Sequence, residues 1–385
     1  MIPPETSWLR NPRAQALCAC LRTGGHQIYF VGGCVRNALL GQSDSDIDLA
    51  TDALPERVMA LGEAAGFHAV PTGIDHGTVT VVVDKEPFEV TTFRRDVETD
   101  GRHAVVAFSN DLADDARRRD FTMNALYADP EGRVLDPVQG LPDLQARRVR
   151  FIEDADARIR EDYLRILRFY RFSAWYADPA QGFDAETLAA IAANLDGLST
   201  LSAERVGQEM RKLLTAPDPA AVVANMGQIG VLHAILPGAE PLLMMLLPHL
   251  EEMSGIASDW LTRLAALGGD NPPDRLRLSR AEARQLAKLN EVGFAGPPVV
   301  ELAYRHGLEM AKQVLLLRAA LAETAVDKGE LPALQAAANA RFPVEAGDLM
   351  PELKGPALGA RLRQLEAAWI ASGFTLTKPE LLALP

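Results

Sequence analysis

Cysteine is scarce in this chain, since only Cys18, Cys20 and Cys34 occur among its 385 residues. This odd number in a long chain argues against a disulfide-stapled scaffold. The Cys-x-Cys pair also lacks the second pair that a tetrahedral zinc site needs. We therefore predict that all three thiols are reduced packing residues.

Long apolar runs are also missing. The longest weakly charged stretch, residues 231–250, is interrupted by Pro237, Glu240, Pro241 and Pro248. It therefore cannot form the helix of about 20 apolar residues that spans a bilayer. The first residues show no basic region followed by an apolar segment, which is the pattern of a secretory signal. These absences predict a cytoplasmic protein without a membrane partner.

Neither aromatic residues nor positive charges are in excess. Aromatic residues make up 6%, hydrophobic residues 48% and charged residues 24% of the chain, as in ordinary globular proteins, so disordered and fibrous classes are excluded. The formal net charge of -13 would disfavour a polyanionic partner if it were spread evenly. Residues 117–171, however, contain twelve arginines against ten acidic residues. This locally basic region coincides with motifs described below.

The first 145 or so residues have the pattern of a mixed α/β domain. Strands are predicted over the β-branched runs Ile28–Val31, Thr78–Val83 and Phe88–Phe93. From about Arg158 onward, Ala- and Leu-rich segments with helical spacing replace them, and no alternating strand pattern follows before Pro385. We therefore expect an α+β protein with a small mixed sheet followed by an all-helical part.

Loop signals divide the helical part. They are the Pro- and Gly-rich segments 217–219, 268–273 and 296–298. One helix start is marked by Ser279, which lies three residues before Glu282 and so predicts a capping box. The length of the chain agrees with two to three domains.

A short apolar strand runs into two glycines in the segment Tyr29–Asn37. Backbone N–H groups at Gly32 and Gly33 can approach a phosphate closely where a strand turns into a helix, and Arg36 would add a charged fork. The spacing matches neither G-x-G-x-x-G nor a P-loop. The alternative is a tight turn without a ligand.

Two aspartates are spaced for metal binding in the segment that follows. If Asp46 and Asp48 lie on a strand, both carboxylates share one face while Ile47 points into the core. Such a pair can hold Mg²⁺ ions for in-line displacement at phosphorus. Glu89, in the strand over 88–93, is placed to join them as a third carboxylate. The alternatives are an acidic surface turn and a solvent-facing strand glutamate.

Three consecutive arginines form a further cluster, Arg117, Arg118 and Arg119. Like charges at this density repel one another unless an anion neutralises them, so a triphosphate or an RNA backbone is a suitable partner. The alternative is a solvated arginine face.

These motifs resemble those of the class II tRNA nucleotidyltransferases and bacterial poly(A) polymerases of the polymerase β superfamily, and are most similar to the bacterial CCA-adding enzymes. The matching segments, in the family's order and spacing, are Gly32–Arg36, Asp46–Thr51 and Arg118–Thr122. A further family signature that leads into the helical part is matched by Asp136, Pro137, Gly140, Asp143 and Leu144. Asn37 departs from the family, which usually has Asp there. The resemblance covers about residues 26–215.

The segment from Glu161 to Arg171 decides the predicted substrate. Asp162 and Arg165 are three residues apart, so we expect them side by side on one helix face. A carboxylate acceptor beside a guanidinium donor matches the Watson–Crick edges of cytosine and adenine and not those of guanine and uracil. The resemblance implies the same role, as an amino-acid template, and implies that Arg168 and Arg171 are further nucleotide ligands. The alternative is a salt-bridged helix with Glu161 paired to Arg165.

The resemblance also assigns two neighbouring segments. Residues 94–115 are polar, with Gly101 and Arg102, and are similar to the family's flexible loop that helps to switch from C to A addition. Residues 201–212 resemble the family's last motif, which we interpret as structural support for the template helix.

Several alternative functions share parts of this pattern. Poly(A) polymerases have the same head and neck, but residues 73–81 resemble the CCA-adding type. An A-adding or CC-adding specialist stays open, although the loop around Arg102 disfavours CC addition alone. None of the seven histidines precedes an Asp, so no appended phosphohydrolase is expected. A non-catalytic RNA-binding adaptor would have lost some of Asp46, Asp48, Asp162 and Arg165, all of which are present.

The resemblance thus implies an enzyme that adds CCA to tRNA 3′ ends from CTP and ATP. It implies a nucleotidyltransferase head at 1–145, a helical neck at 146–212, a helical body at 213–300 and a tRNA-binding helical tail at 301–385. The expected catalytic residues are Asp46, Asp48 and Glu89, with Mg²⁺ held by Asp46 and Asp48. The expected nucleotide-binding residues are Gly32, Gly33, Arg36, Arg119, Asp162, Arg165, Arg168 and Arg171. The sequence predicts no oligomeric state.

Overall fold

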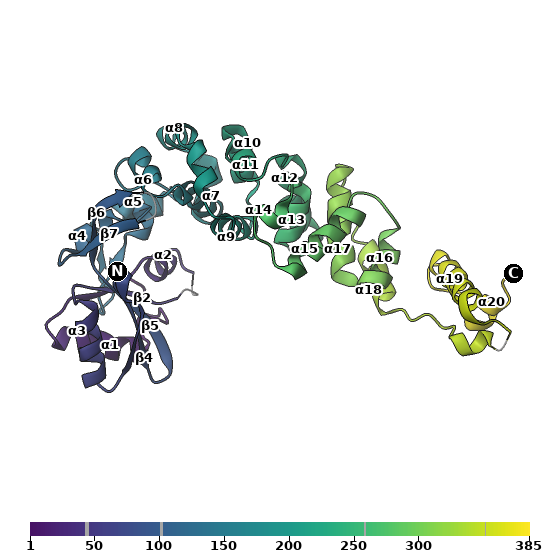
Figure 1. Cartoon of the computed structure of the whole chain (residues 1–385), viewed down its shortest axis with the longest axis horizontal. Helices are drawn as coiled ribbons and strands as arrows, with labels where there is room; N and C mark the ends of the chain where they lie inside the picture. Colours follow the sequence, from purple (N-terminus) through teal and green to yellow (C-terminus); the bar gives the residue numbers. More distant parts are fainter. Residues whose placement is uncertain (43–45, 101–102, 258, 351) are drawn as a thin grey trace. The chain divides into compact units, whose positions relative to one another are not determined.

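The computed structural model describes residues 1–42, 46–100, 103–257, 259–350 and 352–385. The chain divides into two compact units, one formed by residues 1–216 with 221–237 and the other by 217–220 with 238–385. The first unit contains a mixed sheet with helices between its strands, followed by further helices, whereas the regular elements described in the second unit are all helical (Figure 1). The expected α+β class is confirmed.

The main sheet has seven strands in the order β3-β4-β5-β2-β1-β8-β9. Its strands are β1 (Ile28–Val31), β2 (Asp48–Thr51), β3 (His68–Gly73), β4 (Thr78–Val83), β5 (Glu86–Thr92), β8 (Tyr127–Ala128) and β9 (Val134–Leu135). Neighbouring strands are antiparallel except for β2 and β5, which run parallel. The predicted bounds of β1 and β4 are confirmed, whereas β5 begins two residues earlier and ends one residue earlier than predicted.

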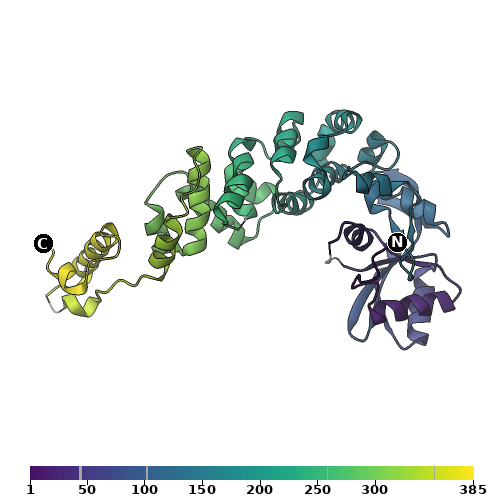
Figure 2. The same cartoon turned by 180° about the vertical axis from the view of Figure 1, so that it is seen from behind.

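One face of the sheet is covered by helices α1 (Pro12–Thr23) and α3 (Pro55–Ala64) (Figure 2). Along β4, Val79, Val81 and Val83 are buried while the residues between them are half-buried. Successive side chains of a strand point to opposite faces, so this alternation places every second valine in a core. Each buried valine contributes roughly 1.5–3 kcal/mol through the hydrophobic effect.

The segment after β5 that resembles the family's flexible loop contains a hairpin. Strands β6 (Arg94–Asp100) and β7 (His103–Phe108) pair antiparallel as a separate sheet. The guanidinium of Arg94 donates to the carbonyl of His76 at 2.5 Å, which ties the base of the hairpin to the turn between β3 and β4. Gly101 and Arg102 lie outside the described residues.

Helices complete the first unit. They are α2 (Gly33–Leu39), α4 (Leu112–Arg117), α5 (Gly140–Gln145), α6 (Ala155–Glu161), α7 (Leu164–Tyr176), α8 (Ala185–Ala193), α9 (Ala203–Leu214), α10 (Ala220–Ile229) and α11 (Val231–Ile235). The apolar stripe of α7 is buried, and α9 packs against this helix. The predicted change to helical structure after the sheet is therefore confirmed.

The second unit is a series of helices. They are α12 (Pro241–Ser254), α13 (Trp260–Leu267), α14 (Pro272–Arg275), α15 (Arg280–Val292), α16 (Val299–His306), α17 (Leu308–Leu321), α18 (Glu330–Asn339), α19 (Gly355–Ala371) and α20 (Lys378–Leu382). The predicted capping box of Ser279 and Glu282 starts α15. Within the residues described, no helix is both long and apolar enough to cross a membrane.

The three cysteines are free thiols, as predicted. Cys18 and Cys34 are buried, and burial raises the pKa of Cys18 to about 12 and that of Cys34 to about 11. Thiols with such pKa values are protonated at neutral pH and are poor nucleophiles.

Candidate functional site

A cavity of about 430 Å³ opens in the first unit between the glycine turn, the start of β2, residues 119–124 and helix α7. The predicted site residues that line it are Gly32, Gly33, Arg36, Asp48, Arg119, Asp162, Arg165 and Arg168. Asp120, Asn124 and Phe172 also line it and were not predicted. Asp46, Glu89 and Arg171 are not among the lining residues.

The glycine turn requires glycine at its first position. Gly32 has a φ of +73° and ψ of −119° and caps the start of α2. A Cβ atom at Gly32 would also lie 3.5 Å from Nη1 of Arg119 and 3.8 Å from the carbonyl oxygen of Asn124. Only a residue without a side chain adopts this conformation at low cost. The turn therefore keeps the main chain close to the arginine that lines the cavity.

Replacing Gly32 by alanine is expected to lower the free energy of unfolding by about 1–3 kcal/mol, because φ stays positive at a residue with a Cβ. The new methyl group next to Arg119 should also raise the KM for the nucleotide. Gly41→Ala is the matched control, because Gly41 has the same φ of +73° but nothing within 4 Å of a new Cβ. Urea unfolding and steady-state kinetics of both variants test this. Equal KM values for the two variants would contradict it.

Arg36 is buried among neutral partners. Its guanidinium donates to Oδ1 of Asn124 at 2.5 Å, to Oδ1 of Asn37 at 2.9 and 3.0 Å and to Oη of Tyr176 at 2.8 Å. It also stacks 4.1 Å from the ring centroid of Tyr176. Burial lowers the pKa of Arg36, an effect that Tyr176 partly opposes. In the described part of the chain Arg36 has no carboxylate ion pair, so its positive charge is available to an anionic ligand.

Two of the predicted carboxylates lie side by side on the parallel strands β2 and β5. Asp48 is the first residue of β2 and pairs in register with Glu89 of β5, as the proposed third carboxylate requires. Asp46 precedes the strand, so the expectation that both aspartates lie on one strand is wrong. Displacement of water by the protein raises the pKa of Asp48, as do the negative charges of Glu89 and Asp46, while Arg119 opposes the rise. Negative charge is thus concentrated at the edge of the cavity.

This carboxylate set suits a hard divalent cation that is shared with a ligand. Within the described residues, no three His, Cys, Asp or Glu side chains are arranged to enclose a metal ion by themselves. Mg²⁺ is usually bound by one or two carboxylates, several waters and substrate phosphates, without an all-protein cage. Asp48, with Asp46 close enough to act on its charge, could provide oxygen ligands for such a site.

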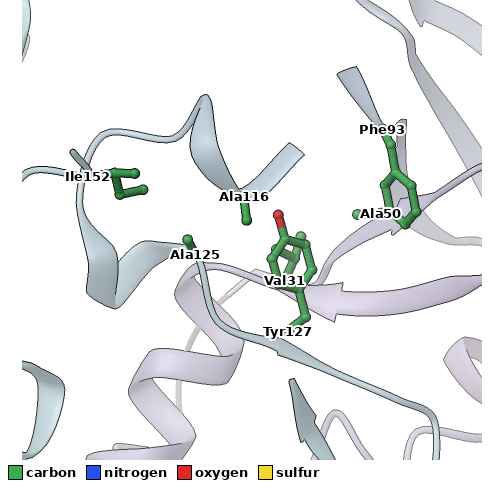
Figure 3. Close-up of a cluster of buried hydrophobic side chains, with 7 residues drawn as sticks. All are labelled: Val31, Ala50, Phe93, Ala116, Ala125, Tyr127 and Ile152. Carbon is green, nitrogen blue, oxygen red and sulfur yellow. The ribbon is translucent and has the colours of Figure 1, made fainter. Parts of the chain in front are cut away.

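Arg119 is held in place by a buried tyrosine. Its Nε donates to Oη of Tyr127 at 3.1 Å and its Nη2 to Asp115 at 3.0 Å, while Tyr127 donates to the same carboxylate at 2.8 Å. Figure 3 shows the ring of Tyr127 inside a hydrophobic cluster that contains Val31, Ala50, Phe93, Ala116, Ala125 and Ile152. Burial lowers the pKa of Arg119, but Tyr127 and Asp115 outweigh burial and leave that pKa above its usual range. The guanidinium is therefore a fixed positive charge at the cavity wall.

Asp120 connects the arginine motif to α7. Its carboxylate accepts hydrogen bonds from Nε and Nη2 of Arg168 at 2.8 and 2.5 Å, from the amide of Asn124 at 2.9 Å and from the main chain of Phe121 at 2.8 Å. Burial raises the pKa of Asp120, but the charge of Arg168 and these hydrogen bonds more than offset burial, and the pKa is lowered. The pair orients Arg168 along the cavity.

This lowered pKa predicts an acid-dependent stability. The native structure favours the ionised form of Asp120, so this carboxylate contributes to the free energy of unfolding. The contribution is complete above the ordinary carboxyl pKa of about 4 and is lost as the pH falls through the lowered native pKa. Asp120→Asn should be less stable than the wild type at pH 7 by about 1–3 kcal/mol. The difference should shrink below about pH 4. Urea unfolding midpoints between pH 7 and pH 2 test this, and parallel curves would contradict it.

The two predicted base-recognition residues do not share a helix face. Asp162 ends α6 in an extended conformation, and α7 begins only at Leu164, so the helix expected across both residues is interrupted. Asp162 accepts from the main chain of Leu164 at 3.1 Å and from Nη2 of Arg205 at 2.6 Å. Arg165 is paired with Glu161, as the structural alternative predicted, and both Asp162 and Arg165 still line the cavity.

Arg171 does not line the cavity and binds a carboxylate of α9 instead. Its Nε donates to the buried carboxylate of Glu209 on α9 at 2.5 Å, and its guanidinium lies 4.2 Å from the ring centroid of Phe172. Glu209 also lies 3.9 Å from Arg168. Residues 201–212, which we interpreted as support for the template helix, therefore contact α7 through charged side chains.

Some of the missed residues carried a signal in the sequence. Asp120 and Asn124 follow the arginine cluster directly, and Phe172 lies one helical turn after Arg168, so proximity to predicted ligands could have identified them. No local pattern links Arg205 to Asp162, because 43 residues separate them.

Comparisons with known proteins agree with this geometry. The family model described as the poly A polymerase head domain matches residues 28–150, and the model described as a probable RNA and SrmB-binding site of polymerase A matches residues 182–243. The mitochondrial CCA tRNA nucleotidyltransferase 1 of Mus musculus is 32% identical over 400 residues, which cover 99% of this chain and 91% of that protein. A CCA-adding enzyme of Geobacillus thermodenitrificans is 41% identical over 236 residues, 60% of this chain and 56% of its own length.

Solved structures show the same relationship. The Bacillus stearothermophilus CCA-adding enzyme in complex with CTP has a TM-score of 0.73 and 29% identity, over 94% of this chain and 92% of that one. The Thermotoga maritima CCA-adding enzyme complexed with tRNA has a TM-score of 0.69 at 18% identity, over 98% and 97% of the two chains, which shows a shared fold. The resemblance on which the sequence analysis relied is thus confirmed.

Proposed function

This chain belongs to the family of CCA tRNA nucleotidyltransferases, and we propose that its cavity adds C, C and A to tRNA 3′ ends from CTP and ATP. The observation that carries the proposal is that one cavity gathers a glycine turn, a carboxylate at a strand start, fixed arginines and the pair Asp162 and Arg165. These groups correspond to the phosphates, the metal-assisted reaction centre and the base of a nucleotide.

The reaction is an in-line displacement. The 3′-hydroxyl oxygen of the tRNA forms a bond to the α-phosphorus, the bond to the bridging oxygen breaks, and pyrophosphate leaves. Arg36 and Arg119, with the main chain of Gly32 and Gly33, hold the triphosphate. Because both guanidinium groups are already fixed by hydrogen bonds, they need little rearrangement when charge develops. Catalysis is then mainly positioning and electrostatic stabilisation, as in other phosphoryl transfers.

Nucleotidyltransferases of this family use divalent metal ions. We assign Mg²⁺ to Asp46 and Asp48, with Glu89 as a third carboxylate beside them. The support is the register pairing of Asp48 with Glu89 and the effect of Asp46 on the pKa of Asp48. When bound, the ions lower the pKa of the attacking hydroxyl and neutralise the leaving oxygens.

Base selection is assigned to Asp162 and Arg165. A carboxylate can accept about four hydrogen bonds and a guanidinium can donate five, so the observed contacts leave capacity for a base. An amino donor beside a ring-nitrogen acceptor satisfies the pair, as in cytosine and adenine. Guanine and uracil present donor and acceptor in the reverse order and would leave the remaining acceptor of Asp162 and donor of Arg165 unsatisfied, which is the strongest basis for discrimination. Arg168 adds a further contact from α7, and we keep Arg171 as a nucleotide ligand that must first leave Glu209.

The remaining assignments concern the helical part and the compartment. We propose that the neck extends over 146–212, the body over 213–300 and the tail over 301–385, following the head at 1–145. Body and tail would contact tRNA by shape and phosphate contacts. We propose a cytoplasmic location for the enzyme.

Nucleotide incorporation tests the function. Labelled CTP, ATP, GTP and UTP are offered singly and together to tRNAs that end before, within and just short of CCA. We expect addition of C, C and then A without G or U. Asp162→Ala should lose this selectivity, because the acceptor for the amino group is gone. Processive addition of A would indicate a poly(A) polymerase, and addition of A only after CC would indicate an A-adding specialist.

A further inference from the structure

The position of Asp162 raises the question of what orients its carboxylate. Asp162 has φ −156° and ψ 105° at the end of α6, so neither α6 nor α7 holds its backbone in helical geometry. Two donors reach its carboxylate: the main-chain N–H of Leu164 at 3.1 Å from Oδ1, and Nη2 of Arg205 at 2.6 Å from Oδ2. Arg205 is therefore the side chain that holds the second oxygen.

Arg205 is itself well placed on α9. Ser202, the N-cap of this helix, accepts a hydrogen bond from the main chain of Arg205 at 3.4 Å. One turn later, Glu209 binds Arg171 of α7 at 2.5 Å. Helix α9 is thus anchored to α7 next to the point from which Arg205 extends. Asp162 lines the cavity and Arg205 does not, so the contact reaches the carboxylate from outside the cavity.

The contact between Arg205 and Asp162 contributes little to folding. The two side chains are 40% and 32% exposed. Ion pairs at this exposure are screened by water and stabilise proteins weakly. A short, charge-assisted hydrogen bond does restrict the orientation of the carboxylate that accepts it, however. Two of the roughly four acceptor positions of the carboxylate are then occupied, and the others stay available.

We infer that Arg205 is a positioning residue for nucleotide selection, which holds the Asp162 carboxylate in the orientation that accepts the amino group of cytosine or adenine. The inference rests on the proposed role of Asp162 in base recognition. A base is recognised only if acceptor and donor keep a fixed spacing, and displacement of a positioned group by about 1 Å can cost roughly a hundredfold in rate.

The test uses the full-length chain with CTP and UTP in competition for a tRNA that lacks CCA. Arg205→Ala should lower the ratio of C to U incorporation by about ten- to a hundredfold. Arg205→Lys, which keeps the charge, should recover part of that ratio. Lys212→Gln is the matched control, because it removes an exposed positive charge from the same helix and should leave the ratio unchanged. Asp162→Ala is measured in parallel, together with the melting temperature of every variant.

The outcomes separate the inference from the proposed function. Loss of selectivity in Arg205→Ala at an unchanged melting temperature, with partial recovery in Arg205→Lys, supports the positioning role. Loss of selectivity in Asp162→Ala but not in Arg205→Ala overturns the inference alone. Unchanged selectivity in Asp162→Ala overturns the base-recognition role and the inference with it. Arg205→Ala could instead lose activity equally for both nucleotides, together with a lower melting temperature. That result would show a merely structural contact and would also overturn the positioning inference.

Discussion

Asp48→Asn is expected to lower kcat for nucleotide addition by about 10³-fold or more. The neutral amide is a much weaker ligand for a divalent cation, and metal ions supply several kcal/mol of charge stabilisation in the transition state. Folding should be unaffected or slightly favoured. The raised pKa of Asp48 shows that its ionised form is disfavoured in the native structure, and asparagine removes its repulsion with Glu89. Single-turnover kinetics together with thermal unfolding separate the two effects.

A matched control exists in the same sheet. Asp84 lies in the turn between β4 and β5 with a φ of +46°, a conformation that asparagine tolerates. Asp84→Asn removes one carboxylate from the sheet at an exposed position outside the cavity, so its kcat should stay within about twofold of the wild type. An equal loss in both variants would show that overall charge matters, and would contradict a metal-binding role for Asp48.

The largest effect on stability is expected in the second unit, at the ion pair of Glu251 and Arg263. Arg263 is 0% and Glu251 6% exposed. Nε and Nη2 of Arg263 donate to the carboxylate at 3.1 and 2.5 Å, and Nη2 also donates to the carbonyl of Pro217 at 3.1 Å. Glu251→Gln should lower the free energy of unfolding by about 3–5 kcal/mol, because it breaks a buried ion pair by removing one of its two charges. Thermal unfolding followed by circular dichroism measures this loss.

The charge explanation can be checked with a double substitution. Glu251→Leu combined with Arg263→Met removes both charges and keeps similar volumes, so most of the lost stability should return. Base selectivity should stay unchanged in these variants, because all the residues assigned to it belong to the first unit. If the double variant is as unstable as Glu251→Gln, packing and not the broken ion pair explains the loss.

Local patterns predicted much of the fold. The strand β4 and the capping box at Ser279 appear in the structure where the sequence indicated them. The hairpin of β6 and β7 was missed because β6 is polar, although the apolar run of β7 carried a strand signal; the two strands pair with each other. The parallel pairing of β2 with β5 had no sequence signal either, because it joins strands far apart in the chain.

For the candidate site, the sequence by itself determined which short motifs to consider: the glycine turn, the carboxylates, the arginine cluster and the pair proposed for base recognition. Each of these depends on a short motif whose chemistry is set by neighbouring residues. Only the tertiary structure decided that Asp162 ends a helix, that Arg171 is bound to Glu209 and that Arg205 holds Asp162. These contacts depend on how α9 packs against α7. A local periodicity specifies which face of a helix is apolar, but the charged partner that meets a side chain is set by the packing of distant segments.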